Sequence, residues 1–345
     1  MGDMEDLFGT PGTPASAARP RPGGRTVGRP VGPAVPDPAL TALGERLPAG
    51  VHLGTSSWSF PGWAGIVYDA PAPESQLSKT GLAAYARHPV LRAVGIDRGF
   101  YQPVAAAEYA AYAAQVPEAF RFLVKGPALV TDESHRDDSG RGTAPNPRFL
   151  DAQTAFDEFV KPAMAGLQDK AGPLVFQFSP LARRTLADVP AFVARLHGFL
   201  WAINRMCAGF TTRPTLAIEV RNPELLTRDF ADALKDAGAR YCLGVHARMP
   251  AAEAQLPLLR ALWPGPLVAR WNLHAGFAYE AAKAHYAPFN RLVDEDPDTR
   301  ATLAKVAAAT ARAGYPVTII ANNKAEGSAP LTLLKLAQAI VEQRD

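Results

Sequence analysis

The sequence contains only two cysteines, Cys207 and Cys242, among its 345 residues. Two cysteines give neither a disulfide framework nor a paired metal-ligand spacing, and a reducing compartment permits such usage. We therefore expect a cytoplasmic protein whose fold does not depend on disulfides.

Long apolar runs and a strong net charge are also missing. No apolar stretch approaches the roughly 20 residues that a membrane-spanning helix needs, so no membrane partner is expected. The first residues lack the apolar core and cleavage site of a secretion signal. A net charge of only +3 creates no field that would demand nucleic acid. With 48% apolar and 20% charged residues, the chain can fill one barrel-sized globular domain.

Residues 1–45 differ in composition from the rest of the chain. Proline and glycine recur there without helical or strand periodicity, and Arg19, Arg21, Arg25 and Arg29 lie among them. Such a segment buries too little apolar surface to offset its ordering entropy. We predict a disordered tail over 1–45 and a single domain over 46–345. The arginines could contact RNA or another anion, although a solubilising role is favoured.

From Val51 onward, apolar strand-like runs alternate with segments of helical periodicity. The predicted strands are 51–56, 92–97, 120–125, 173–178, 215–220, 240–245, 266–271 and 316–322. The predicted helices are 81–87, 104–115, 149–167, 188–205, 225–237, 253–263, 298–313 and 331–343. Eight such units indicate a (β/α)8 TIM-type barrel. A doubly wound open sheet is the alternative, but no glycine-rich dinucleotide motif follows the first strand.

Nearly every predicted strand ends at a polar residue, and a parallel barrel builds its site at those ends. Side-chain alternation puts Glu219 on the face shared with Ala217 and Arg221, which points toward the barrel axis. Two long connections, 131–148 and 272–297, follow strands at the same rim and are candidate lids or binding loops. The candidate residues at the strand ends and first loop are Ser56, Trp58, Asp97, Tyr101, Lys125, Gln177, Glu219, Arg221, His246, Arg270, Asn322 and Asn323.

Six segments in order resemble motifs of the YecE-like family, a domain of unknown function. They are GTSSWSFPGW at 54–63, DRGFY at 97–101, FLVKGP at 122–127, GPLVFQ at 172–177, IEVRNP at 218–223 and NNKAEGSAP at 322–330. The resemblance runs from about Val51 to the C-terminus and implies a barrel without an established reaction. Gly95 departs from the family pattern, which usually has a glutamate there. Either the mechanism of this chain does not use that carboxylate, or the chain belongs to a divergent branch of the family.

Charge at the predicted rim favours a small anionic ligand. Four cations, Lys125, Arg221, Arg270 and Lys324, face two carboxylates, Asp97 and Glu219. Glu219 is the leading candidate for a general acid or base. An alternative of nearly equal weight is a buried ion pair with Arg221 or Arg270, because an unpaired buried charge is costly.

Other roles follow from residue type. Lys125 could form a Schiff base with a carbonyl substrate if burial or neighbouring cations lowered its pKa, but anchoring an anion is favoured. Trp58 and Tyr101 could stack on a base or sugar. Too few ligands gather for a metal site, since the candidates His246, Asp97, Glu219 and His274 stand among cations and amides.

Three classes of function remain open from the sequence. The leading hypothesis is an enzyme without cofactor or metal, such as a hydrolase, lyase or isomerase, acting on a small anionic or phosphorylated substrate. Its catalytic residues would be Glu219, Lys125 and Asp97, with the other candidates binding substrate. A non-catalytic protein that binds a nucleotide or phosphosugar is the alternative, and a nucleic-acid-binding protein is less favoured. The oligomeric state is not predicted.

Overall fold

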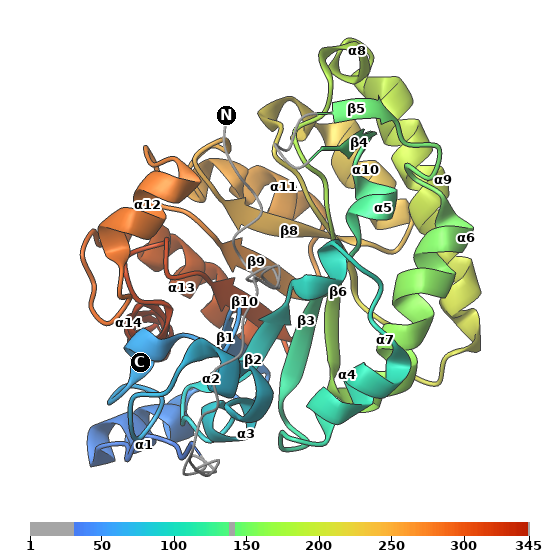
Figure 1. Cartoon of the computed structure of the whole chain (residues 1–345). Helices are drawn as coiled ribbons and strands as arrows, with labels where there is room; N and C mark the ends of the chain where they lie inside the picture. Colours follow the sequence, from blue (N-terminus) through green and yellow to red (C-terminus); the bar gives the residue numbers. More distant parts are fainter. Residues whose placement is uncertain (1–30, 138–141, 344–345) are drawn as a thin grey trace, which may run out of the picture.

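Eight parallel strands close into a barrel in the computed structural model, which describes residues 31–137 and 142–343 (Figure 1). Around the barrel the order is β1-β10-β9-β8-β7-β6-β3-β2. The ring closes where β1 pairs with β10, with Val51 beside Val317. The barrel strands are β1 Val51–Thr55, β2 Leu91–Ile96, β3 Arg121–Lys125, β6 Ala171–Gln177, β7 Leu216–Glu219, β8 Arg240–Val245, β9 Leu267–Trp271 and β10 Val317–Ala321. The predicted (β/α)8 barrel is confirmed, and the open sheet is excluded.

The interior of the barrel is filled by one side chain from most of its strands. This inner layer contains Ala93, Leu123, Val175, Ala217, Cys242, Val268 and Ile320. Side chains alternate along a strand, so the residue two positions later faces the same way. The alternation brings Lys125, Gln177, Glu219 and Arg270 to the next level toward the C-terminal ends, as the sequence predicts.

Helices surround the strands on the outside of the barrel (Figure 1). The α-helices that correspond to predicted ones are α3 Leu82–Tyr85, α4 Ala106–Ala113, α6 Ala152–Ala155, α7 Lys161–Leu167, α9 Val189–Met206, α10 Arg228–Asp236, α11 Leu256–Ala261, α13 Pro297–Arg312 and α14 Ala329–Glu342. A π-helical turn, Phe156–Val160, joins α6 to α7. In the proline-rich 253–263 region, the 3-10 turn Glu253–Gln255 precedes the short α11. Within the described part of the chain, no helix is long and apolar enough to cross a membrane.

Both long connections at the C-terminal end of the barrel contain secondary structure. After β3 come α5 Ala128–Thr131 and an antiparallel hairpin of β4 Ser134–Arg136 and β5 Gly142–Pro145, near α8 Arg183–Leu186 (Figure 1). After β9 comes α12 Tyr279–Tyr286, and Tyr286 packs with Leu273 in a small apolar cluster of its own. These segments border the rim where the predicted site lies.

The N-terminal boundary of the domain requires a correction. Helix α1, Pro38–Arg46, lies beside α14 and occupies part of the segment predicted to be a disordered tail (Figure 1). The side chain of Asp37 accepts a hydrogen bond from Leu40 N at 2.7 Å, which caps the helix. Leu43 is buried, and Arg92 donates to the carbonyl of Leu47 at 3.1 Å. Residues 1–30 of the predicted tail lie outside the described residues.

Helix α2, Glu74–Thr80, which precedes α3, was also not predicted. Its only fully buried side chain is Leu77, and the indole nitrogen of Trp58 donates to the Leu77 carbonyl at 3.1 Å. With so few apolar contacts, the helix has little periodicity that a sequence pattern could show.

Candidate functional site

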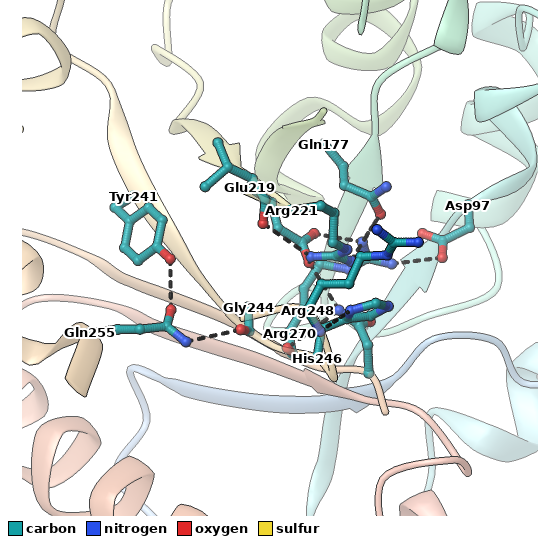
Figure 2. Close-up of polar contacts among 12 residues, drawn as sticks. Asp97, Gln177, Glu219, Arg221, Tyr241, Gly244, His246, Arg248, Gln255 and Arg270 are labelled. Carbon is teal, nitrogen blue, oxygen red and sulfur yellow. Dashed lines mark hydrogen bonds and ion pairs between the residues drawn. The ribbon is translucent and has the colours of Figure 1, made fainter. Parts of the chain in front are cut away.

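Glu219 is the centre of a buried ion-pair network at the end of β7 (Figure 2). Its carboxylate has no solvent exposure and takes one guanidinium on each oxygen. Arg221 Nη1 lies 2.5 Å from Oε1, and Arg270 Nη1 lies 2.7 Å from Oε2. Asn272 Nδ2 also donates to Oε1 at 2.9 Å. Three neighbouring side chains thus satisfy this carboxylate.

The ion pairs decide the protonation state of Glu219. Burial alone raises the pKa of a carboxyl group, but Arg221 and Arg270 outweigh that effect and lower the pKa of Glu219 to about 2. The group is therefore ionised at neutral pH and poorly suited to donate a proton. Its geometry matches the ion-pair alternative from the sequence and favours a role in holding two arginines.

Arg270 extends the network to the other side of the barrel. Its Nη2 lies 2.7 Å from Asp97 Oδ2, so one guanidinium joins Asp97 to Glu219. Gln177 Oε1 accepts from Arg270 Nη1 at 3.1 Å and from Arg221 Nη2 at 3.3 Å. Residues from four strands or strand ends thereby form one connected polar layer, as Figure 2 shows.

Gly244, on β8, and Gln255, in the 3-10 turn that follows, also support this layer and were missed by sequence reasoning. A Cβ added at Gly244 would lie 3.1 Å from both Arg221 Nη1 and Glu219 Oε1, so the glycine leaves room for the ion pair. Gln255 donates to the Gly244 carbonyl at 3.1 Å and accepts from the Tyr241 hydroxyl at 2.6 Å (Figure 2). Gly244 carries no functional group, and Gln255 lies in a proline-rich stretch, so no sequence signal pointed to either.

Lys125 lies at the end of β3 and is 8% exposed. Its ammonium group sits 3.6 Å from the centroid of the Phe100 ring, a cation–π contact. Burial lowers the pKa of Lys125 to about 8, although the nearby carboxylate of Asp97 opposes the shift and Arg270 adds to it. Among residues 31–137 and 142–343, no carboxylate is within ion-pair distance of Lys125 Nζ. This cation is therefore not neutralised by a direct partner.

Lys324, just after β10, has a similar environment. Its Nζ lies 3.8 Å from the centroid of Tyr279, on α12, and 3.5 Å from Asn322 Oδ1. Burial lowers the pKa of Lys324 to about 8, and Lys283 contributes further. The connection after β9 therefore covers this second buried lysine with an aromatic ring.

The amide residues after β10 have separate roles. Asn322 Nδ2 donates to Ser56 Oγ at 2.9 Å, which joins two candidates at adjacent strand ends. Asn323 Oδ1 instead accepts from Trp63 Nε1 at 3.2 Å and from Ala329 N, at the start of α14, at 2.9 Å. These contacts favour a structural role for Asn323 in place of ligand binding.

His246 follows β8 and lies near the arginines (Figure 2). Burial, with added repulsion from Arg221, lowers the pKa of His246 to about 4, so the ring is neutral at pH 7. Its Nδ1 accepts from Arg248 N at 3.1 Å, which leaves the proton on Nε2. His246 can therefore offer one N–H donor near the network.

The two predicted stacking residues differ in accessibility. Trp58 is 8% exposed, and its ring packs edge-on against Tyr112 at a centroid distance of 5.4 Å. Its burial favours packing under the first loop. Tyr101 is 48% exposed and packs edge-on against Phe100, whose ring contacts Lys125. Tyr101 is thus the better placed of the two to meet a ligand.

Gly95 lies on β2 close to the first strand end. An added Cβ there would lie 3.3 Å from both Cα and the carbonyl oxygen of Ser56 and 3.5 Å from Ile320 Cγ2. The space is narrow, and a larger side chain would require its neighbours to shift. The carboxylate at this end of β2 is supplied by Asp97. Across the described residues, no group of three or more His, Cys, Asp or Glu side chains gathers in a geometry that could hold a metal ion.

The fold and site define a (β/α)8 barrel with a polar, partly cationic layer at the C-terminal ends of its strands. The chain belongs to the family described as Protein of unknown function DUF72, whose model matches residues 52–345. The YecE-like proteins are members of this family, so the resemblance drawn from the sequence motifs is confirmed.

Two solved structures of the same family are similar to this chain. A DUF72 family protein from Enterococcus faecalis V583 is 17% identical, with 84% of this chain and 95% of that chain covered and a TM-score of 0.52. One from Thermotoga maritima MSB8 is 16% identical, with 84% and 98% covered and a TM-score of 0.49. At such identities the first similarity supports the barrel fold alone. The comparison with curated proteins found no match.

Proposed function

We propose that the barrel is an enzyme that binds a small anionic or phosphorylated substrate at its C-terminal rim and needs no cofactor. One observation carries the proposal: Arg221 and Arg270 are paired with carboxylates, whereas Lys125 and Lys324 are buried against aromatic rings instead. An anion bound near these lysines would supply the missing counter-charge. Because both amines are already buried, little water would have to be removed from them on binding.

Some rim residues would bind the substrate, and others would take part in the reaction. Glu219 would hold Arg221 and Arg270 in position, so the carboxylate acts through the arginines. Lys125 would contact the anion and exchange protons with it, because a pKa of about 8 allows both protonation states near neutral pH. Asp97, whose Oδ1 is buried without a hydrogen-bond partner among the described residues, would accept from a donor on the substrate. Ser56, Tyr101, Gln177, His246 and Asn322 would complete the binding surface.

The same contacts would serve a non-catalytic protein that binds a nucleotide or phosphosugar. Nucleic acid is less favoured, because Trp58, one of the two predicted stacking residues, is buried. We also propose a cytoplasmic location, because Cys207 and Cys242 are both buried and form no disulfide, as is usual in a reducing compartment.

Native mass spectrometry of freshly purified protein tests the proposal. We expect the wild type to retain an acidic small molecule, and the variants Lys125→Met and Lys324→Met to lose it. Lys79→Met, at an exposed position of α2, is the matched control and should keep it. A ligand that stays on both rim variants would contradict the proposal. So would a wild type that neither retains an anion nor is stabilised by added phosphate.

Incubation with the recovered molecule separates the two functions. A change in the mass or the NMR spectrum of that molecule, absent with Lys125→Met, indicates an enzyme. Recovery of the molecule unchanged indicates a binding protein.

A further inference from the structure

Lys125 lies at the rim without a carboxylate partner, which a lysine with a purely structural role would normally have. The preceding inward residue on β3, Leu123, belongs to the apolar inner layer, so the lysine stem rises from the apolar filling of the barrel. Its amine rests on the face of Phe100. A lysine that served only to stabilise the fold would need a carboxylate to offset its burial.

The surroundings of Lys125 favour a nucleophilic amine. With a pKa of about 8, about one-tenth of the amine is neutral at pH 7, compared with well under one-thousandth for an ordinary lysine. Burial and the neighbouring guanidinium of Arg270 produce this shift. Desolvation and adjacent positive charge are the conditions under which lysines attack carbonyl carbons.

Asp97 provides a carboxylate whose charge acts on the amine of Lys125. One of its oxygens, Oδ2, is fixed by Arg270 at 2.7 Å, while the other, Oδ1, is buried and has no hydrogen-bond partner among the described residues. Arg270 Nε is likewise buried and unpartnered there. The rim therefore has an amine without an ion-pair partner, together with a carboxylate oxygen and a guanidinium N–H that have no hydrogen-bond partner among the described residues.

We propose that Lys125 forms an imine with the carbonyl carbon of an anionic aldehyde or ketone bound at this rim. The inference rests on the proposed anion site and names its substrate class. The nitrogen lone pair forms the C–N bond while the C=O π pair moves to oxygen, and a proton passes from nitrogen to that oxygen by way of Asp97. Asp97 then receives the second nitrogen proton and returns it to the departing hydroxyl group. The nitrogen pair closes the C=N bond as water leaves. Amine and carbonyl give imine and water, with no oxidation or reduction.

Lys324 offers the internal comparison. It is also buried against an aromatic ring and also has a lowered pKa. Glu280, whose charge raises the pKa of Lys324, lies on α12 and already pairs with Lys283 at 3.9 Å. Lys324 should therefore bind an anion but form an imine less readily than Lys125.

Reductive trapping tests the inference on the full chain. The protein is incubated at pH 7 with pyruvate and sodium cyanoborohydride, and the modified lysines are located by peptide mass spectrometry. We expect Lys125 to be labelled at least about tenfold faster than Lys324 or the exposed Lys79, and Asp97→Asn to slow labelling at Lys125 by about tenfold or more. Acetone, a neutral ketone, should label Lys125 much more slowly than pyruvate.

Labelling of Lys125 no faster than Lys79, or equal labelling by acetone and pyruvate, would overturn the inference. If Asp97→Asn does not fold, phosphate supplies the second test on the wild type, since it should slow pyruvate labelling of Lys125 but not of the exposed Lys79. No slowing by phosphate would count against the inference.

Thermal unfolding separates this failure from failure of the anion site. If Lys125 is not labelled but pyruvate still raises the Tm of the wild type and not of Lys125→Met, the imine is wrong and the anion site stands. If pyruvate and phosphate leave the wild-type Tm unchanged, both proposals fail.

Discussion

Replacing Glu219 with glutamine should destabilise the protein by about 3 kcal/mol. The substitution keeps the size of the side chain but removes the charge that two guanidinium groups share. Arg270 would retain Asp97 at 2.7 Å, whereas Arg221 would retain the amide oxygen of Gln177 at 3.3 Å. The lowering of the Glu219 pKa from 4.5 to about 2 corresponds to about 3 kcal/mol of preference for the ionised form. Removing one partner of a buried ion pair typically costs about 3 to 5 kcal/mol, in agreement with the value from the pKa shift.

Urea denaturation at pH 7 measures this effect. The midpoint should fall while the slope of the free energy of unfolding with urea stays the same. Glu118→Gln is the matched control, because Glu118 pairs with Lys170 at 3.0 Å but its side chain is 88% exposed. That variant should change stability by less than about 0.5 kcal/mol. A loss below about 1 kcal/mol in Glu219→Gln would refute the reasoning.

Two further predictions use the same assay. Gly244→Ala should cost about 1 to 3 kcal/mol, because its Cβ would crowd Glu219 and Arg221, whereas Gly198→Ala in α9, with open space around it, should be neutral or stabilising. Equal effects of the two would contradict the tight fit at Gly244. Between pH 7.5 and 9.5 the wild type should gain about 2 kcal/mol of stability relative to Lys125→Met, because the folded pKa of about 8 lies below that of the unfolded chain, which then binds more protons. Parallel pH curves would rule out the buried, shifted amine.

The fold was predictable because periodicity and parity act over many residues. Alternation along β3, β6, β7 and β9 predicted that Lys125, Gln177, Glu219 and Arg270 share the inner face. Arg270 contacts both Gln177 and Glu219, and the charges of Arg270 and Glu219 act on Lys125, as this prediction requires. The alternation of side chains predicts only which face of the strand a side chain is on, not which partner it contacts. It left open whether Glu219 pairs with Arg221 or Arg270, and the structure shows both.

Other features depended on contacts that local patterns do not encode. Helix α1 was not predicted because it lies in a proline-rich segment. In the structure Asp37 caps the helix and Leu43 is buried in the core. Asn323 and Trp58 have the residue types of a binding site, yet their polar groups bond to Ala329 N and the Leu77 carbonyl. Only the packed structure distinguishes a polar group that holds the fold from one that faces a ligand.

The central claim is that the rim binds an anion through Lys125. Isothermal titration calorimetry with inorganic phosphate at pH 7 tests it most directly. We expect measurable binding by the wild type and by Lys79→Met, and an affinity at least about tenfold lower in Lys125→Met, because a charge-assisted contact worth about 1.5 kcal/mol or more is lost. Equal affinities of the wild type and Lys125→Met would contradict it.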